Sequence, residues 1–237
     1  GVSAVEGLIR RVDSVWLGRP NNPTGKGISK GEIKYLSKRF PQKLFILDES
    51  FVQFTEDWFP ETYISGDLPQ NIIVIHSLTK FYSLAGIRMG AAIAHRYMVE
   101  SLLRFKEPWT VNGVADKIAP FLAFEEEYES KTRRFVKNER IRLRGQIMSD
   151  PSWDVLESEA NYFLLKWKGG KTLEEVMDLL YKNGIFVRDA RNFVGLEENY
   201  IRVGLRSEEE NDLLLSHLKA LTGEAYVQPI SISGLCA

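Results

Sequence analysis

The sequence has 237 residues, 44% of them hydrophobic, and a formal net charge of −1. These values are typical of a globular chain and give no overall attraction to nucleic acid or to an anionic membrane, so we expect neither as a partner. The one cysteine, Cys236, excludes a disulfide within the chain and favours a cytoplasmic location. No apolar run approaches the roughly 18 residues of a transmembrane helix, and residues 1–11 lack the apolar core of a signal peptide.

The first half of the chain alternates segments typical of helices and of strands. Ser29 and Glu32 have the spacing of a capping box, which predicts a helix that ends near Phe40. Further helices are expected at residues 4–11, 97–105, 114–124 and 125–148. The last of these is expected to carry an apolar stripe of Tyr128, Thr132, Phe135, Leu143 and Ile147. Short strands are expected at residues 14–18, 44–47, 72–75 and 89–94.

The second half begins after Asp150-Pro151-Ser152, which predicts a boundary. One helix is expected at residues 172–183, ended by Gly184, and Ser207 is expected to cap another that reaches about Leu221. Strands are expected at residues 153–156, 162–165, 185–187 and 200–205. The predicted organisation is a large domain at 1–124, a connecting helix at 125–150, a small α+β domain at 151–222 and a tail at 223–237.

A lysine follows one of the predicted buried strands. Lys80 lies three residues after Ser77 and eight residues before Arg88. A lysine amine can condense with an aldehyde to form a Schiff base, while a hydroxyl and a guanidinium can hold a phosphate group. This spacing suits a phosphorylated aldehyde cofactor; the alternative is a solvated loop lysine beside a surface arginine. The three histidines show no metal-ligand spacing, so we expect no metal.

Two further segments place polar side chains where strands are predicted to end. Asn22-Pro23-Thr24-Gly25 is a rigid turn that can direct the Asn22 side chain into a cleft. Asp48 follows the apolar strand at 44–47, and ligands of open α/β sheets bind beyond the carboxyl ends of the strands. A carboxylate at such a place can pair with a protonated pyridine nitrogen. A plain turn and a loop carboxylate are the alternatives.

Together, the three segments resemble the motifs of pyridoxal-phosphate (PLP) enzymes of the aspartate-aminotransferase fold. In that family an N-P-x-G turn, a strand-end D-x-x-Y/F and an S-x-x-K followed by an arginine occur in this order. The resemblance implies an α/β fold whose large domain has a mostly parallel sheet, here without its N-terminal part, plus a small C-terminal α+β domain. It implies PLP as the cofactor, with Lys80 and Asp48 as the catalytic residues. The cofactor-binding residues would be Asn22, Asp48, Ser77, Lys80 and Arg88.

Two arginines in the C-terminal half resemble the family's substrate-binding positions. Arg202 matches the arginine that binds the substrate α-carboxylate in a two-pronged ion pair. Arg188 resembles the second anion contact of members that handle phosphorylated substrates, and Asn22 completes the expected substrate-binding set. Strand-end arginines paired with Asp189 or Glu198 are the alternative.

Phe51 departs from the family pattern, because many members carry a tyrosine there that donates to the phenolic oxygen of the cofactor. A phenylalanine cannot donate a hydrogen bond. The resemblance then leaves Asn22 as a main donor to that oxygen. We therefore expect the Schiff base on Lys80 to be more basic than in a relative that has the tyrosine.

Local strings resemble two groups within the family, the threonine-phosphate decarboxylases and the histidinol-phosphate aminotransferases. The first group, whose members make the aminopropanol phosphate of cobalamin, is favoured by residues 77–82, 108–112, 188–196 and 200–211. We expect a lyase that decarboxylates L-threonine O-3-phosphate, with a histidinol-phosphate-type aminotransferase as the alternative. The same residues can serve both reactions, because the choice depends on how the substrate is oriented. A third hypothesis is a non-catalytic effector-binding module of a regulator, which would carry the same binding residues.

Members of the family have a longer segment before the N-P-x-G turn, which carries part of the cofactor site and contacts the partner subunit. We therefore expect this sequence to be an N-terminally truncated piece of a homodimeric protein. Sheet edges and apolar helix faces would then be exposed.

Overall fold

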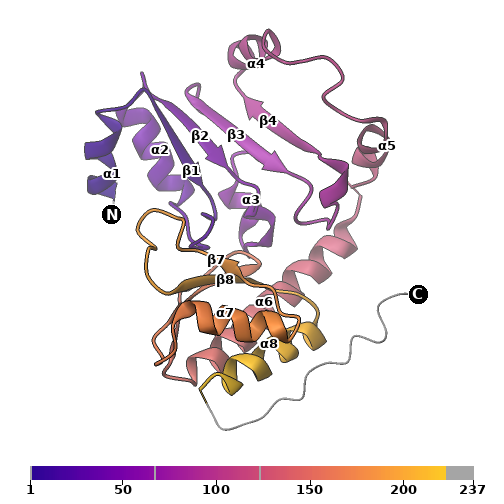
Figure 1. Ribbon diagram of the computed structural model, residues 1–237. Coiled ribbons are helices and arrows are strands. Elements are labelled where there is room, and N and C mark those ends of the chain that lie inside the picture. The colour runs from indigo at the N-terminus through magenta and orange to yellow at the C-terminus, as the bar shows by residue number, and fades with distance from the viewer. Residues whose placement is uncertain (1, 67, 123, 223–237) are drawn as a thin grey trace. The chain divides into compact units, whose positions relative to one another are not determined.

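The computed structural model describes residues 2–66, 68–122 and 124–222 (Figure 1). The chain forms two compact units. Unit 1 comprises Gly1–Asn22 and Lys26–Phe135, and unit 2 comprises Pro23–Gly25 and Val136–Ala237. The division falls within one long helix, α6 (Glu126–Met148). The tail expected at residues 223–237 lies outside the described residues.

The sheet of unit 1 has four strands in the order β1-β2-β3-β4 (Figure 1). They are β1 (Ser14–Gly18), β2 (Leu44–Asp48), β3 (Ile72–Ser77) and β4 (Gly90–Ala94). The first three are parallel, with Asp48 in register with Gly18 on one side and Ile75 on the other, whereas β4 is antiparallel to β3. The four strands predicted for this half are confirmed, and the carboxyl ends of three of them meet at one end of the sheet.

The helices of unit 1 precede, connect or follow the strands of its sheet along the chain. Their bounds are α1 (Val2–Ile9), α2 (Lys30–Arg39), α3 (Trp58–Glu61), α4 (Arg96–Leu103) and α5 (Gly113–Leu122). The capping box predicted at Ser29 is confirmed, because the Glu32 backbone N–H donates to Ser29 Oγ over 3.2 Å and the Glu32 carboxylate accepts from the Ser29 backbone over 2.9 Å. Ile9 of α1 and Leu36 of α2 pack with Phe45 of β2 in one buried core.

Three short elements of unit 1 were not predicted. They are α3 and the 3₁₀ turns η1 (Val52–Phe54) and η2 (Ala85–Ile87). Each has four residues or fewer, so the apolar periodicity that predicts longer helices has no room to develop. η1 follows the strand that carries Asp48, and η2 lies in the loop between β3 and β4, so both are close to the predicted site in sequence.

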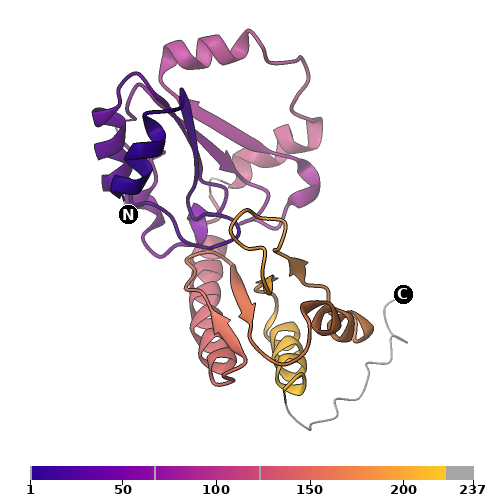
Figure 2. The same cartoon turned by 60° about the vertical axis from the view of Figure 1, so that its left-hand side comes forward.

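Unit 2 contains an antiparallel sheet in the order β5-β6-β8-β7. Its strands are β5 (Trp153–Val155), β6 (Tyr162–Trp167), β7 (Arg188–Asp189) and β8 (Tyr200–Gly204), and its helices besides α6 are α7 (Leu173–Lys182) and α8 (Glu208–Ala220). The end of α6 packs with α7, α8 and the sheet in a second buried core (Figure 2). Side chains such as Leu143, Phe163, Val176, Ile201 and Leu215 form it.

Two details of the expected secondary structure are wrong. Residues 185–187 are not a strand, because the pairing with β8 begins only at Arg188 and the preceding chain diverges from it. The stripe on α6 includes Val136, which is 5% exposed, instead of Phe135, which is 40% exposed. One residue turns a helix by about 100°, so Val136 shares the face of Leu143 and Ile147, and Phe135 does not.

Within residues 2–66, 68–122 and 124–222, no helix combines the length and apolar character needed to cross a membrane. In this part of the chain there is also no group of three or more His, Cys, Asp or Glu residues that could hold a metal ion.

Candidate active site

Lys80 lies in the loop that follows β3 in unit 1. Its Nζ is 3.3 Å from Ser77 Oγ, and the Ser77 hydroxyl is also 2.8 Å from Thr79 Oγ1. Both hydroxyl residues are buried, whereas Lys80 is exposed. The amine also lies 5.9 Å from the centre of the Phe51 ring, within the range of a cation–π contact. The lysine amine is thus held by a hydroxyl and an aromatic ring while it stays accessible to a ligand.

A cavity of about 420 Å³ lies between this loop and β4. Its polar lining residues are Ser50, His76, Ser77, Thr79, Lys80 and Arg88. Beside the cavity the backbones of β3 and β4 approach closely, since a Cβ added at Gly90 would lie 2.7 Å from the His76 carbonyl oxygen. Two cations and several hydroxyls around one cavity suit an anion such as a phosphate group. The structure therefore brings together three of the predicted cofactor residues, Ser77, Lys80 and Arg88.

The backbone of Arg88 is left-handed, with φ +52° and ψ +55°. Its Nη1 donates to the Ala85 carbonyl oxygen over 2.8 Å, which closes the turn η2. Ser83, in the same loop, also has a positive φ of 55°. Non-glycine residues seldom adopt this region, and such positions concentrate at ligand-binding sites. The conformation of the loop is consistent with a role in binding.

Asp48 ends β2, the strand beside β3. It is half-buried, and its Oδ1 accepts a hydrogen bond from the Ser50 backbone N–H over 3.0 Å. Asp48 is in register with Ile75 of β3, which places it beside the strand that leads into the lysine loop. Asn22 is exposed and follows β1 by four residues. The described lining of the cavity includes Ser50 but neither Asp48 nor Asn22.

Aromatic side chains hold the lysine loop against α6 and η1. The Phe81 ring is 2% exposed and its centre lies 5.1 Å from that of Phe54, and the Phe81 carbonyl oxygen accepts from the Tyr128 hydroxyl over 3.0 Å. The Tyr82 hydroxyl donates to Glu129 Oε1 over 2.6 Å. Burial, reinforced by this carboxylate, raises the pKa of Tyr82 to about 12. The two hydrogen bonds to α6 join residues 47 positions apart, so no local sequence pattern could reveal them.

Arg188 and Arg202 lie on neighbouring strands of unit 2. The register of β7 and β8 places the two residues directly opposite each other, so their side chains leave the same face of the sheet. The Arg202 guanidinium carbon is 5.2 Å from the centre of the Tyr162 ring. That of Arg188 is 6.0 Å from the Phe193 ring, and its Nη2 donates to Asn192 Oδ1 over 3.1 Å. Two arginines at directly opposite positions create a positive potential that favours a bound carboxylate or phosphate.

The two acidic residues considered as partners of these arginines form other ion pairs. Asp189 Oδ2 is 2.8 Å from Arg191 Nη2, and this guanidinium lowers the pKa of Asp189. Glu198 Oε2 is 3.1 Å from Lys166 Nζ. Each of these carboxylates is thus paired with another cation, although Arg188 also acts on Asp189 electrostatically.

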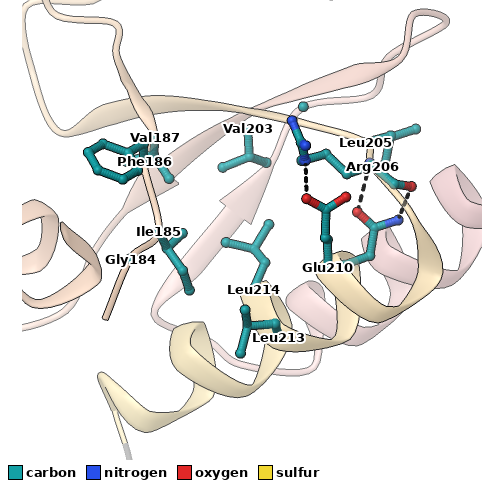
Figure 3. Close-up of a pocket in the computed structure, with 12 residues that line it drawn as sticks. Gly184, Ile185, Phe186, Val187, Val203, Leu205, Arg206, Glu210, Leu213 and Leu214 are labelled. Atoms are coloured by element: carbon teal, nitrogen blue, oxygen red, sulfur yellow. Dashed lines mark hydrogen bonds and ion pairs between the residues drawn. The ribbon is translucent and has the colours of Figure 1, made fainter. Parts of the chain in front are cut away.

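A second cavity, of about 500 Å³, lies in unit 2 where the chain before β7 diverges from β8. Figure 3 shows apolar side chains around it, among them Ile185 and Leu214. Its polar groups are engaged with one another: Arg206 Nε donates to Glu210 Oε1 over 2.7 Å, and the Arg206 backbone N–H donates to Asn211 Oδ1 over 2.9 Å (Figure 3). An apolar lining with internally paired polar groups offers no catalytic constellation.

Comparison with known proteins identifies relatives of the chain. The family model described as "Aminotransferase class I and II" matches residues 2–218. A protein of Caldanaerobacter subterraneus subsp. tengcongensis, named provisionally as a threonine-phosphate decarboxylase, is 34% identical over 221 residues. This match covers 91% of the chain and 59% of the relative, so the chain spans about three-fifths of that protein's length.

Solved structures of the same kind share its fold. The histidinol-phosphate aminotransferase from Clostridium acetobutylicum superposes with a TM-score of 0.87 at 27% identity, over 93% of this chain and 67% of the other. The L-threonine-O-3-phosphate decarboxylase from Porphyromonas gingivalis gives a TM-score of 0.79 at 28% identity, over 89% and 64%. These superpositions confirm the predicted α/β fold with its mostly parallel first sheet. Because the family model matches nearly all of its length, the chain belongs to the aminotransferase class I and II family.

Proposed function

We propose that the protein is a PLP-dependent enzyme that decarboxylates L-threonine O-3-phosphate. The observation that carries the proposal is the cavity in which Ser77, Thr79, Lys80 and Arg88 gather beyond the carboxyl end of β3. Similarity to proteins named as threonine-phosphate decarboxylases supports the substrate. Since the chain spans 59% of such a relative, the activity, the substrate and the partner are proposed for the whole protein.

The residues of this cavity fit two groups of PLP, its phosphate and its aldehyde. Arg88, with the hydroxyls of Ser77 and Thr79, supplies charged and neutral donors for its phosphate. Lys80, exposed and 3.3 Å from Ser77 Oγ, would hold its aldehyde covalently. When bound, PLP supplies an electron sink for the pair released at the substrate Cα. Asp48 would keep a proton on the ring nitrogen.

Each proposed residue then has a separate task. Arg202 binds the substrate carboxylate and Arg188 the substrate phosphate, which is supported by their directly opposite places on β8 and β7. Once the substrate amine has taken its place on the cofactor, Lys80 would be free to carry a proton. When the bond between Cα and the carboxylate breaks and carbon dioxide leaves, Lys80 Nζ would deliver the proton that Cα requires. Asn22 would donate to the phenolic oxygen of the cofactor and contact the substrate.

A histidinol-phosphate-type aminotransferase is the second candidate. The TM-score of 0.87 with the Clostridium acetobutylicum enzyme favours it. In that reaction Lys80 Nζ would remove a proton from Cα, and the amino group would move to a keto acid. The same arginines would bind the anionic ends of the substrates, so the two candidates differ in which bond at Cα is broken.

Product analysis by mass spectrometry tests the proposal. The protein is incubated with PLP and O-phosphothreonine, with and without 2-oxoglutarate. We expect aminopropanol phosphate and carbon dioxide in both cases. Keto product plus glutamate, with histidinol phosphate as the better amine donor, would contradict decarboxylation and favour the aminotransferase. PLP binding without either product would favour the effector-binding module of a regulator.

We also propose that the protein is a homodimer in the cytoplasm. Support for a partner surface comes from the exposed fractions of Phe105 and Trp109, which are 87% and 94%. Aromatic residues are enriched at protein–protein interfaces. Sedimentation analysis of the protein tests the dimer, and fractionation of cells tests the location.

A further inference from the structure

Arg19 is a buried cation in unit 1 that the predicted site does not include. It lies between β1 and Asn22, and it is 5% exposed. Its Nη1 is 3.0 Å from Oε1 of Glu49, a residue that directly follows Asp48 and is 0% exposed. Its Nη2 is 3.0 Å from Glu61 Oε2. One guanidinium therefore ties the segment after β1 to the segment after β2 and to α3.

Backbone hydrogen bonds make the same connection. The Arg19 N–H donates to the Asp48 carbonyl oxygen over 2.8 Å, and the Glu49 N–H donates to the Ile75 carbonyl oxygen over 2.8 Å. These bonds extend the pairing of β1, β2 and β3 past the ends of the strands. The chain reaches Asn22 only three residues after Arg19. The ion pair therefore lies at the point where two proposed cofactor residues leave the sheet.

Stability alone is a weak reason for a buried ion pair. Taking two charges out of water is costly, and apolar replacements of such pairs are often neutral or stabilising. Both oxygens of the Glu49 carboxylate are nevertheless engaged, Oε1 by Arg19 and Oε2 by the Thr62 hydroxyl. Burial raises the pKa of Glu49, and both contacts oppose that rise. A pair that is this completely bonded fixes geometry, because its charges cannot separate without leaving one of them unpaired.

We propose that the Arg19–Glu49 ion pair is a positioning element that fixes Asn22 and Asp48 relative to each other for PLP binding. This inference rests on the proposed function. Neither Arg19 nor Glu49 lines the described cavity, so both act through their neighbours in the chain. Arg19 supplies a fork that reaches two carboxylates at once, which a lysine at this position would not reproduce.

Variants of the full chain test this role. Arg19→Met removes the pair, Arg19→Lys keeps the charge without the fork, and Arg19→Met combined with Glu49→Gln removes both charges. Lys43→Met is the matched control, because it breaks an ion pair of 3.6 Å with Asp13 that joins the beginnings of the same two strands. Each variant is measured for PLP affinity, for the pH midpoint of the visible absorbance of the bound cofactor, and for the urea midpoint of unfolding.

We expect Arg19→Met to weaken PLP binding by about tenfold, close to the lower end of the range for one charge-assisted hydrogen bond, and to shift the pH midpoint of the absorbance. Arg19→Lys should recover part of the affinity. Lys43→Met should change neither the PLP affinity nor the pH midpoint of the absorbance. The double variant should regain the urea midpoint, because no unpaired charge stays buried, yet keep the weak affinity.

The positioning role is wrong if the double variant binds PLP as tightly as the unaltered protein and has the same absorbance midpoint. That variant also decides the matter if Arg19→Met alone does not fold. The site itself is checked by borohydride reduction, which should label Lys80 in every variant. Absence of this label in the unaltered protein would contradict the proposed function, and this inference with it. A Lys80 label combined with an affinity that no variant changes would contradict the positioning role alone.

Discussion

The two units carry their proposed functional groups in different parts of a sheet. In unit 1, Asp48 and Ser77 end parallel strands, and Lys80 and Arg88 follow in the loop after β3. In unit 2, Arg188 and Arg202 lie within paired strands, on one face of an antiparallel sheet. The first arrangement depends on loop conformation, and the second depends on strand register.

The kind of sheet explains this difference. Parallel strands are commonly covered on both faces, which leaves their ends for ligands. An antiparallel sheet can pack one face against helices and leave the other face open to solvent or a ligand. In unit 2, Phe163, Ile201 and Val203 belong to the core with α7 and α8, and Arg202 lies between the last two in sequence and so on the opposite face. A register shift of one residue would turn it into the core.

The largest effect is expected at the loop of unit 1. Lys80→Ala should lower the rate of decarboxylation by about 10²–10⁴-fold, the usual contribution of a positioned proton-transfer group. The measurement is single-turnover product formation with saturating PLP. Lys43→Ala serves as the control, because Lys43 lies before β2 and pairs with Asp13. Full activity in Lys80→Ala would show that Lys80 takes no part in the reaction.

The next effect is expected on the sheet face of unit 2. Arg202→Ala should weaken binding of amines that bear a carboxylate by about 2–5 kcal/mol, the scale for truncating one partner of a buried charge pair. The binding of an amine without the carboxylate should be weakened much less. Titration of both ligands into the PLP-loaded protein measures the difference. Equal losses would mean that Arg202 supports the sheet and does not bind substrate.

A smaller effect is expected for Arg188, which is exposed on the shorter strand. Arg188→Ala should weaken the binding of O-phosphothreonine by about 1.5–3 kcal/mol, the range of a hydrogen bond to a charged group. The binding of threonine should stay nearly unchanged. Arg191→Ala is the matched control, since the Arg191 guanidinium is already paired with Asp189 and Glu174. If both variants affect both substrates alike, the face has no phosphate site.

The smallest effect concerns stability against acid, to which each unit contributes one buried histidine. Burial lowers the pKa of His76 in unit 1 and of His217 in unit 2. The unfolded chain therefore binds a proton at each histidine more readily than the folded chain does. These groups stabilise the fold above about pH 6.5, the ordinary pKa of histidine. This contribution is lost as the pH falls through the lowered pKa of the folded state.

Urea unfolding between about pH 8 and 5 measures this contribution. His76→Gln and His217→Gln should each flatten the decline of the unfolding free energy toward acid. A decline that stays as steep in both variants would assign the acid sensitivity to carboxylates instead.

The features that the sequence predicted are local ones. Asp48 follows an apolar run, Ser29 and Glu32 form a capping box, and Ser77 lies three residues before Lys80. Each pattern spans a few residues, so backbone geometry converts it directly into a strand end, a cap or a hydrogen bond of 3.3 Å. The roles of these residues toward a cofactor came from the family resemblance and stay predictions.

The features that the sequence did not reveal depend on distant partners. The ion pair of Arg19 with Glu49 joins positions 30 residues apart, and the Tyr82–Glu129 hydrogen bond joins positions 47 apart. The strand expected at 185–187 failed for the same reason, because its apolar residues favour a strand but β8 pairs only from Arg188 onward. Register and long-range charge pairing are set by the packed chain, and no window of sequence contains them.

Chemical trapping is the most direct test that Lys80 holds the cofactor. The PLP-loaded protein is reduced with borohydride, digested and mapped by mass spectrometry, with Lys80→Ala treated in parallel. We predict a single modified peptide that contains Lys80 and disappears in the variant. A label on Lys43 or Lys106, or the same label in Lys80→Ala, would contradict it.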